Sequence, residues 1–178
     1  MSDYFELLLI FIAAVNPPAV VLALERRDAK AAALGGAVAA VLVLLAALLG
    51  EDLLAALDIE PESFRIAAAI VMAISGCAAL LRLRTAAPAP AGWQAGIFPL
   101  AVPLLGGPAV LVAAVSYGVD EGAGPTLAAA LPVIAVAAAL TLYPVARWRP
   151  AADGLARILG ALLVVVAAGL AIDGVRAV

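Results

Sequence analysis

The run Asn16-Pro17-Pro18-Ala19-Val20 interrupts an uncharged apolar stretch, and a related run, Gly106-Gly107-Pro108-Ala109-Val110, follows in the second half of the chain. Proline lacks a backbone N–H group and breaks a helix. In lipid every backbone polar group needs a partner, so a broken helix persists only where protein or a water-filled cavity satisfies the freed groups. Two such breaks indicate a site, and they are typical of transporters that are built from two related halves.

The composition places the chain in a lipid bilayer. Apolar residues make up 67% of the 178 residues, charged residues make up 13%, and the mean hydropathy is +1.19, which is far from an ordinary soluble domain. A membrane-spanning helix needs about 20 mostly apolar residues. Six uncharged stretches approach or exceed this length, and the two shortest have flanking charged residues that can snorkel: Leu7–Leu24, Ala31–Gly50, Ile66–Leu81, Thr85–Val119, Gly122–Ala146 and Ile158–Ile172. We therefore predict an all-α polytopic membrane protein with six transmembrane helices and no soluble domain.

The charged residues between the stretches predict the orientation. Short cytoplasmic loops retain Lys and Arg. Most of the basic residues fall after the first, third and fifth stretches: Arg26, Arg27, Lys30, Arg82, Arg84, Arg147, Arg149 and Arg157. The other loops are acidic, with Arg65 and Arg176 as the basic exceptions on that side, so we predict that both termini lie outside the cytoplasm. Thr141 and Tyr143 are expected close to a membrane interface, where they act as anchors.

A repeat relates the two halves. Three spans in each half make the second half enter the membrane from the opposite side, so the repeat must be inverted. Pro18-Ala19-Val20-Val21-Leu22-Ala23 resembles Pro108-Ala109-Val110-Leu111-Val112-Ala113, and Phe64-Arg65-Ile66-Ala67 answers Ala156-Arg157-Ile158-Leu159. The second and fifth stretches show no match, so the repeat rests on the Pro and Arg positions. We predict one membrane domain, with residues 1–84 as the first repeat, 85–92 as a short cytoplasmic linker and 93–178 as the second repeat.

The two breaks form the predicted site. Proline suits the first turn of a helix, so Pro17 or Pro18 is expected to open one half-helix and Pro108 another, near the membrane midplane. A helix N-terminus exposes unpaired N–H groups and about half a positive elementary charge, which suits a carboxylate. Asn16 is expected to cap its half-helix or to offer its amide to a solute, and the glycines let backbone approach closely. The predicted substrate-binding residues are those at the breaks: Asn16, Pro17, Pro18, Ala19, Gly106, Gly107, Pro108 and Ala109.

Three further residues are candidates for the path or gate, and each has a plainer alternative. Arg65 and Arg157 lie at span ends, where they can instead snorkel or pair with Glu62 and Asp153 respectively. Ser75 lies within the third span, where its hydroxyl can bond to its own helix. For the breaks themselves the alternative is a simple kink, because Pro and Gly are common in transmembrane helices. Two breaks at related repeat positions favour the site.

Several function classes are excluded by what the chain lacks. It has no histidine, hence no His-based triad or zinc-protease motif, and it has no Gly-x-Ser-x-Gly or phosphate-binding loop. No carboxylate falls at a span centre, so neither an aspartyl pair nor a buried proton relay is expected. We predict no enzymatic activity, no metal, no cofactor and, with a net charge of -3, no nucleic-acid partner. The acidic residues before the first stretch predict a retained helix instead of a signal peptide, and Cys77 is expected to be a small packing residue.

Longer motifs run through the chain at these positions. The most specific is Ile97-Phe98-Pro99-Leu100-Ala101-Val102-Pro103-Leu104-Leu105-Gly106-Gly107-Pro108, and shorter ones are Asn16-Pro17-Pro18, Gly50-Glu51, Leu57-Asp58-Ile59, Phe64-Arg65-Ile66-Ala67, Arg157-Ile158-Leu159-Gly160 and Asp173-Gly174-Val175. Over essentially the whole chain they resemble the signatures of the MarC family. The resemblance implies a six-helix bacterial inner-membrane protein, with SnatA-like members that transport small neutral amino acids such as glycine and alanine.

The pattern and the resemblance together predict a secondary transporter of small neutral amino acids, or similar small polar solutes, that works by alternating access in the bacterial plasma (inner) membrane. Its expected partners are a small-molecule substrate and the lipid bilayer. The sequence leaves open whether the chain forms a homo-oligomer, in which direction it transports and whether transport is coupled to H+ or Na+. The alternative is a membrane-embedded interaction or assembly protein without transport activity, because broken helices also pack against partners.

Overall fold

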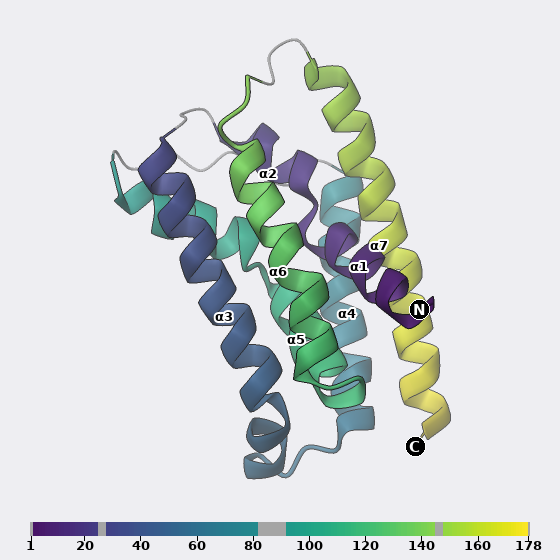
Figure 1. The fold of residues 1–178 in the computed structure, drawn as a ribbon. Coiled ribbons are helices and arrows are strands. Elements are labelled where there is room, and N and C mark those ends of the chain that lie inside the picture. Colours follow the sequence, from purple (N-terminus) through teal and green to yellow (C-terminus); the bar gives the residue numbers. More distant parts are fainter. Residues whose placement is uncertain (1, 25–27, 82–91, 145–147, 178) are drawn as a thin grey trace.

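The computed structural model describes residues 2–24, 28–81, 92–144 and 148–177, and every regular element in these ranges is helical. The elements form one bundle, shown in Figure 1. In chain order they are α1 (Ser2–Val15), α2 (Pro17–Ala23), α3 (Ala29–Ala56), α4 (Pro61–Leu80), η1 (Gly96–Leu105), α5 (Pro108–Asp120), α6 (Ala123–Leu140) and α7 (Arg149–Ala177). The predicted all-α fold is confirmed. The predicted linker, residues 85–92, lies almost wholly outside the described residues.

The described part of the structure has five or six candidate spans, where the sequence predicts six. Five helical segments are long and apolar enough to cross a membrane, and a sixth is obtained when η1 and α5 count as one span. Those two meet at a bend of 57°, and neither alone has the roughly 20 residues that a crossing needs. The third and sixth spans do extend past their uncharged cores, to 20 residues in α4 and 29 in α7.

The longest helix contact joins α4 to α7, which lie side by side in Figure 1. Their backbones touch at Gly76 of α4, where an added Cβ would come within 2.7 Å of the Gly160 carbonyl oxygen. Gly174, near the end of α7, lies against the carbonyl oxygen of Glu62, near the start of α4. The two helices are therefore antiparallel. Without a hydrophobic force between helices in lipid, such small residues stabilise a pair by letting the backbones approach.

The other long contact face belongs to α3. Its buried residues recur at about one turn of the helix: Ala31, Gly35, Ala39, Val43, Ala47, Gly50 and Leu54. They pack against η1 and α5. Gly96 of η1 abuts the Ala31 carbonyl oxygen, and Gly118 of α5 abuts that of Ala47. A row of mostly small residues, spaced about one helical turn apart on α3, thus packs against both parts of the bent span.

Two side-chain predictions outside the site are wrong. Cys77 is exposed on α4, so it faces the surroundings of the bundle instead of packing inside it. Thr141 is buried, and its hydroxyl donates to the Ala138 carbonyl oxygen at 2.6 Å. The hydroxyl is satisfied within its own helix end and is not free to anchor at an interface. Tyr143, in contrast, is 66% exposed, as an interface residue is expected to be.

Candidate functional site

The first break lies at Asn16, between α1 and α2. Asn16 has φ 51° and ψ 66°, in the left-handed region that Asn tolerates better than other residues with side chains. Its own N–H group donates to the Ile12 carbonyl oxygen at 3.0 Å and so ends α1. Pro17 and Pro18 then open α2, as predicted. Asn16 is 2% exposed, so this polar residue is sealed inside the apolar bundle.

The N-terminus of α2 is fully satisfied by Asn16. Pro17 and Pro18 have no N–H group. The Ala19 N–H group donates to both the backbone and the side-chain oxygen of Asn16, at 2.9 and 3.3 Å, and the Val20 N–H group donates to the Asn16 backbone oxygen at 3.1 Å. The expectation that Asn16 caps this helix is confirmed. The expectation that α2 exposes unpaired N–H groups is wrong, because two prolines and a capping Asn leave none in the first turn.

The side-chain amide of Asn16 joins this break to α7. Its Nδ2 atom donates to the Ala156 carbonyl oxygen at 2.8 Å. An amide nitrogen has two N–H donors, and this bond uses one. Ala156 lies about 13 Å along the helix axis from Val165, the centre of the uncharged stretch of α7, at a rise of about 1.5 Å per residue. The first break is therefore nearer to one end of that stretch than to its middle.

The second break lies between η1 and α5, and it is built from backbone. Gly106 and Gly107 are buried, and the Gly106 N–H group donates to the Ala101 carbonyl oxygen at 2.7 Å. A Cβ at Gly106 would lie 3.8 Å from the Ala39 Cα atom, which is close to the middle of α3. A Cβ at Gly107 would lie 2.6 Å from the Pro103 carbonyl oxygen, so no larger residue fits without a shift.

The N-terminus of α5 differs from that of α2 in its free donors. Gly107 stands at the cap position without a side chain, and Pro108 opens the helix. The Val110 and Leu111 N–H groups both donate to the Gly107 carbonyl oxygen, at 3.0 and 3.1 Å. Pro108 has no N–H group. The N–H groups of Gly107 and Ala109 are therefore the two backbone donors at this N-terminus that make no hydrogen bond within the turn. These two residues are buried and Pro108 is exposed.

The residues around the two breaks share one core. A single cluster of buried side chains contains Val15 and Val20, which flank the first break, and Leu105 and Ala109, which flank the second. The helix α1 also packs against α5. Of the remaining predicted site residues, Pro17 is buried, and Pro18 and Ala19 are half-buried. The sequence thus predicted which residues interrupt the helices, but not that the two interruptions differ in their free donors.

The predicted path or gate residues lie at three different places. Arg65 does not form its ion pair with Glu62. Its Nε atom donates to Asp120 Oδ2 at 2.9 Å and its Nη2 atom donates to Asp120 Oδ1, which ties α4 to the end of α5. Arg157 pairs with Asp153 at 3.3 Å, one turn away on α7, as predicted. Ser75 is half-buried on α4, next to the close contact at Gly76.

Sequence reasoning missed Ser116 of α5. Ser116 is 2% exposed, and its hydroxyl is the one buried side-chain oxygen or nitrogen without a hydrogen-bond partner in the described part of the chain. Leaving such a group unpaired costs about 1–3 kcal/mol. The run Ala114-Val115-Ser116-Tyr117 has nothing in it that indicates a site, because a single Ser in an apolar helix normally bonds to its own backbone.

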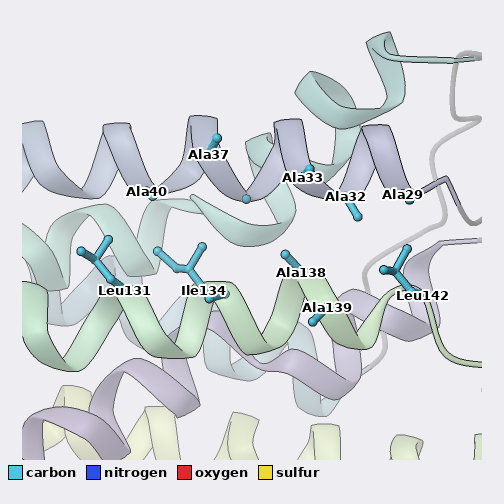
Figure 2. A pocket seen from close by; sticks show the side chains of 12 residues that line it. Ala29, Ala32, Ala33, Ala37, Ala40, Leu131, Ile134, Ala138, Ala139 and Leu142 are labelled. Atoms are coloured by element: carbon cyan, nitrogen blue, oxygen red, sulfur yellow. The ribbon is translucent and has the colours of Figure 1, made fainter.

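An apolar groove separates α3 from α6 and has a volume of about 520 Å³. Figure 2 shows Leu131 and Ile134 of α6 facing the alanines of α3 across it. No residue that lines the groove has a polar side chain. The groove therefore does not suit a charged solute, and it includes none of the predicted site residues.

These observations define a class of protein before they define a family. A bundle with five or six helices long and apolar enough to cross a membrane is a multi-pass membrane protein. The family of MarC family integral membrane proteins matches residues 1–178, and the chain belongs to this family. The resemblance predicted from the motifs is thereby confirmed. No curated protein and no solved structure matches the chain.

Proposed function

We propose that the chain is a secondary transporter of small neutral amino acids, or similar small polar solutes, in the bacterial inner membrane. The observation that carries this proposal is the buried break before α5, where the N–H groups of Gly107 and Ala109 are not used by their own turn. A helix N-terminus of this kind suits a carboxylate. The substrate class is the one that the family resemblance implies.

The packing of the helices supports an inverted repeat, which alternating access would use. The repeat pairs the first span with η1 and α5, α3 with α6, and α4 with α7. When each element is replaced by its partner in the other repeat, the contact of α3 with η1 and α5 becomes the contact of α6 with α1 and α2, and both contacts are present. Likewise the contact of α4 with α5 corresponds to that of α7 with α1 and α2. Among described residues, the contact of α5 with α6 is the exception, since α1 and α2 have no equally extensive contact with α3.

The two ends of the bundle differ in charge, which supports the proposed orientation. The end where α3 meets α4 and α5 meets α6 carries Glu51, Asp52, Asp58, Glu60, Glu62, Asp120 and Glu121. This end lies at the bottom of Figure 1, together with the C-terminus. Described basic residues at the opposite end include Lys30, Arg149 and Arg157, whereas Arg26, Arg27, Arg82, Arg84 and Arg147 lie outside the described residues. Because cytoplasmic loops retain Lys and Arg, we place the acidic end and both termini outside the cytoplasm.

The solute carboxylate is proposed to sit at the N-terminus of α5, and the Asn16 amide is proposed to face the solute from the other half. Asn16 would use the second N–H donor of Nδ2 or exchange its bond with Ala156. Such an exchange would release the first break from α7, and this gives the break a way to move during transport. No carboxylate site is assigned to α2, because its first turn has no free donor.

Counterflow in proteoliposomes tests the proposal. Purified full-length protein should exchange labelled glycine or alanine against internal unlabelled substrate, and protein-free liposomes should not. Alaninamide, which lacks the carboxylate, should fail to compete, because the proposed site binds that group. The variant Asn16→Gly keeps a residue that tolerates the left-handed backbone but removes the amide, and it should reduce exchange. Absence of flux with every amino acid tested, together with a stable partner on purification in mild detergent, would indicate an interaction protein instead.

A further inference from the structure

We propose that Ser116 and Asp120 form an outer subsite for the ammonium group of the solute, and that the Arg65 guanidinium occupies the Asp120 carboxylate when no solute is bound. The inference rests on the proposed transport function and adds a second contact point to it. The carboxylate site at α5 is built from backbone N–H groups, which cannot bind an ammonium group. A zwitterion needs an acceptor elsewhere along its path.

The unpaired hydroxyl of Ser116 contrasts with the other buried hydroxyls. Thr126 donates to the Gly122 carbonyl oxygen at 2.9 Å, and Thr141 donates to the Ala138 carbonyl oxygen at 2.6 Å. Both therefore follow the usual behaviour of a hydroxyl in a membrane helix. Ser116 is equally sealed, at 2% exposed, and it does not make this bond. Its oxygen is the one buried side-chain acceptor without a hydrogen-bond partner in the described part of the chain.

Ser116 lies directly behind Asp120 on α5. The spacing of Ala109, Ala113, Ser116 and Asp120 places all four on one face of the helix. The first three are buried. Ser116 and Asp120 are four residues apart, so their Cβ atoms are about 5–6 Å apart, and one ammonium group with three donors can reach an oxygen of each. Ser116 is seven residues past Ala109, about 10 Å along the axis of α5. The subsite is therefore an earlier position on the path from the acidic end, and a small amino acid occupies it before its carboxylate reaches the N-terminus of α5.

Arg65 occupies Asp120 in this structure and has other carboxylates near it. The two side chains are 22% and 19% exposed, at the edge of the bundle. Glu62 of α4 and Asp173 of α7 lie near enough to interact electrostatically with Arg65, although neither forms an ion pair with it. If an ammonium group displaces the guanidinium from Asp120, these two acids are the new partners that Arg65 can reach. The displacement would also separate α4 from α5 and uncover Ser116, which couples solute binding to opening of the outer end.

Opposite effects of two substitutions distinguish a subsite from a structural ion pair. Equilibrium binding of alanine to the purified full chain in mild detergent is the measurement. Asp120→Asn removes the acceptor of the ammonium group and should weaken binding about tenfold, whereas Arg65→Gln removes its competitor and should strengthen binding severalfold. A purely structural ion pair would be broken equally by both substitutions, so shifts in the same direction would overturn the inference.

Ser116 is tested against a matched hydroxyl. Ser116→Ala should weaken alanine binding about tenfold, as expected for the loss of one hydrogen bond to a charged group, and should leave the melting temperature unchanged or higher. The control Thr126→Val also removes a buried hydroxyl, and it should lower the melting temperature and leave alanine binding unchanged. Wild-type exchange of alanine with unchanged binding by Ser116→Ala would overturn the subsite alone. Failure of wild-type exchange would instead remove the proposed function, and the subsite with it.

Discussion

Replacing Asn16 separates the three roles of this residue at the first break. The residue adopts a left-handed backbone with φ 51°, it accepts from the Ala19 N–H group at 3.3 Å, and it donates to the Ala156 carbonyl oxygen at 2.8 Å. Asn16→Ala removes both side-chain hydrogen bonds. It also puts alanine, which tolerates the left-handed backbone less well than asparagine does, at this position. Asn16→Gly removes the same bonds without that backbone cost.

The expected magnitudes follow from these contacts. A hydrogen bond between membrane helices contributes about 0.6–1.7 kcal/mol. The left-handed backbone costs an ordinary L-residue about 1–2 kcal/mol. Loss of an N-cap costs about 0.5–2 kcal/mol when the replacement is Ala and only a few tenths of a kcal/mol when it is Gly. Because the capping bond of Asn16 is long, we use the lower part of the range for Ala. We therefore expect Asn16→Ala to lower the free energy of unfolding by about 3 kcal/mol and Asn16→Gly by about 1.5 kcal/mol.

Reversible unfolding in mixed micelles of a mild detergent and dodecyl sulfate, followed by circular dichroism, measures these differences. Ser116→Ala is the matched control, because it removes a buried polar group that has no partner and should leave the stability unchanged or raise it. Equal destabilisation by Ala and Gly would show that the backbone conformation of Asn16 contributes nothing. A loss below about 0.5 kcal/mol in both variants would refute the hydrogen-bond argument as a whole.

Three further predictions test the packing and the surface. Gly76→Ala should destabilise the bundle by about 1–3 kcal/mol, because its Cβ would meet an α7 carbonyl oxygen at 2.7 Å. The control Gly169→Ala has open space around it and should be neutral or slightly stabilising. The same unfolding assay compares the two variants, and equal effects would contradict the close contact at Gly76. Cys77→Leu should change the stability in that assay by less than about 0.5 kcal/mol, because the side chain is exposed, and a larger loss would place it inside a contact. Arg157→Gln should change the stability by less than about 1 kcal/mol, since its pair with Asp153 is 44% and 28% exposed, and a larger loss would mean that Arg157 has a structural role beyond that pair.

The part of the fold that sequence predicts best is the set of spans. Membrane helices need long uncharged stretches, so five of the six expected segments reappear directly, and the sixth reappears as the bent pair of η1 and α5. The capping role of Asn16 and the helix starts at Pro17 and Pro108 are equally local. Each depends on backbone chemistry within one turn, which residue identity alone decides.

The partners of polar side chains are not predicted in this way. The ion pair of Arg65 crosses from α4 to Asp120 of α5, although Glu62 is nearer in sequence. The amide of Asn16 reaches Ala156 of α7 across almost the whole chain. Both contacts exist because packed helices bring residues that are distant in sequence to the same level of the bundle. The order of residues along the chain does not show which residues share a level.

The sequence by itself determined the solvent of the protein, the places where its helices break and the residues that start them again, because these follow from hydropathy and from missing backbone donors. Only the tertiary structure decided which partners the polar side chains find. The Asn16 amide donates to Ala156 of α7, Arg65 pairs with Asp120 of α5 instead of Glu62, and the buried Ser116 hydroxyl has no partner among the described residues. These contacts depend on which helices pack together, and residue type within one turn does not specify that.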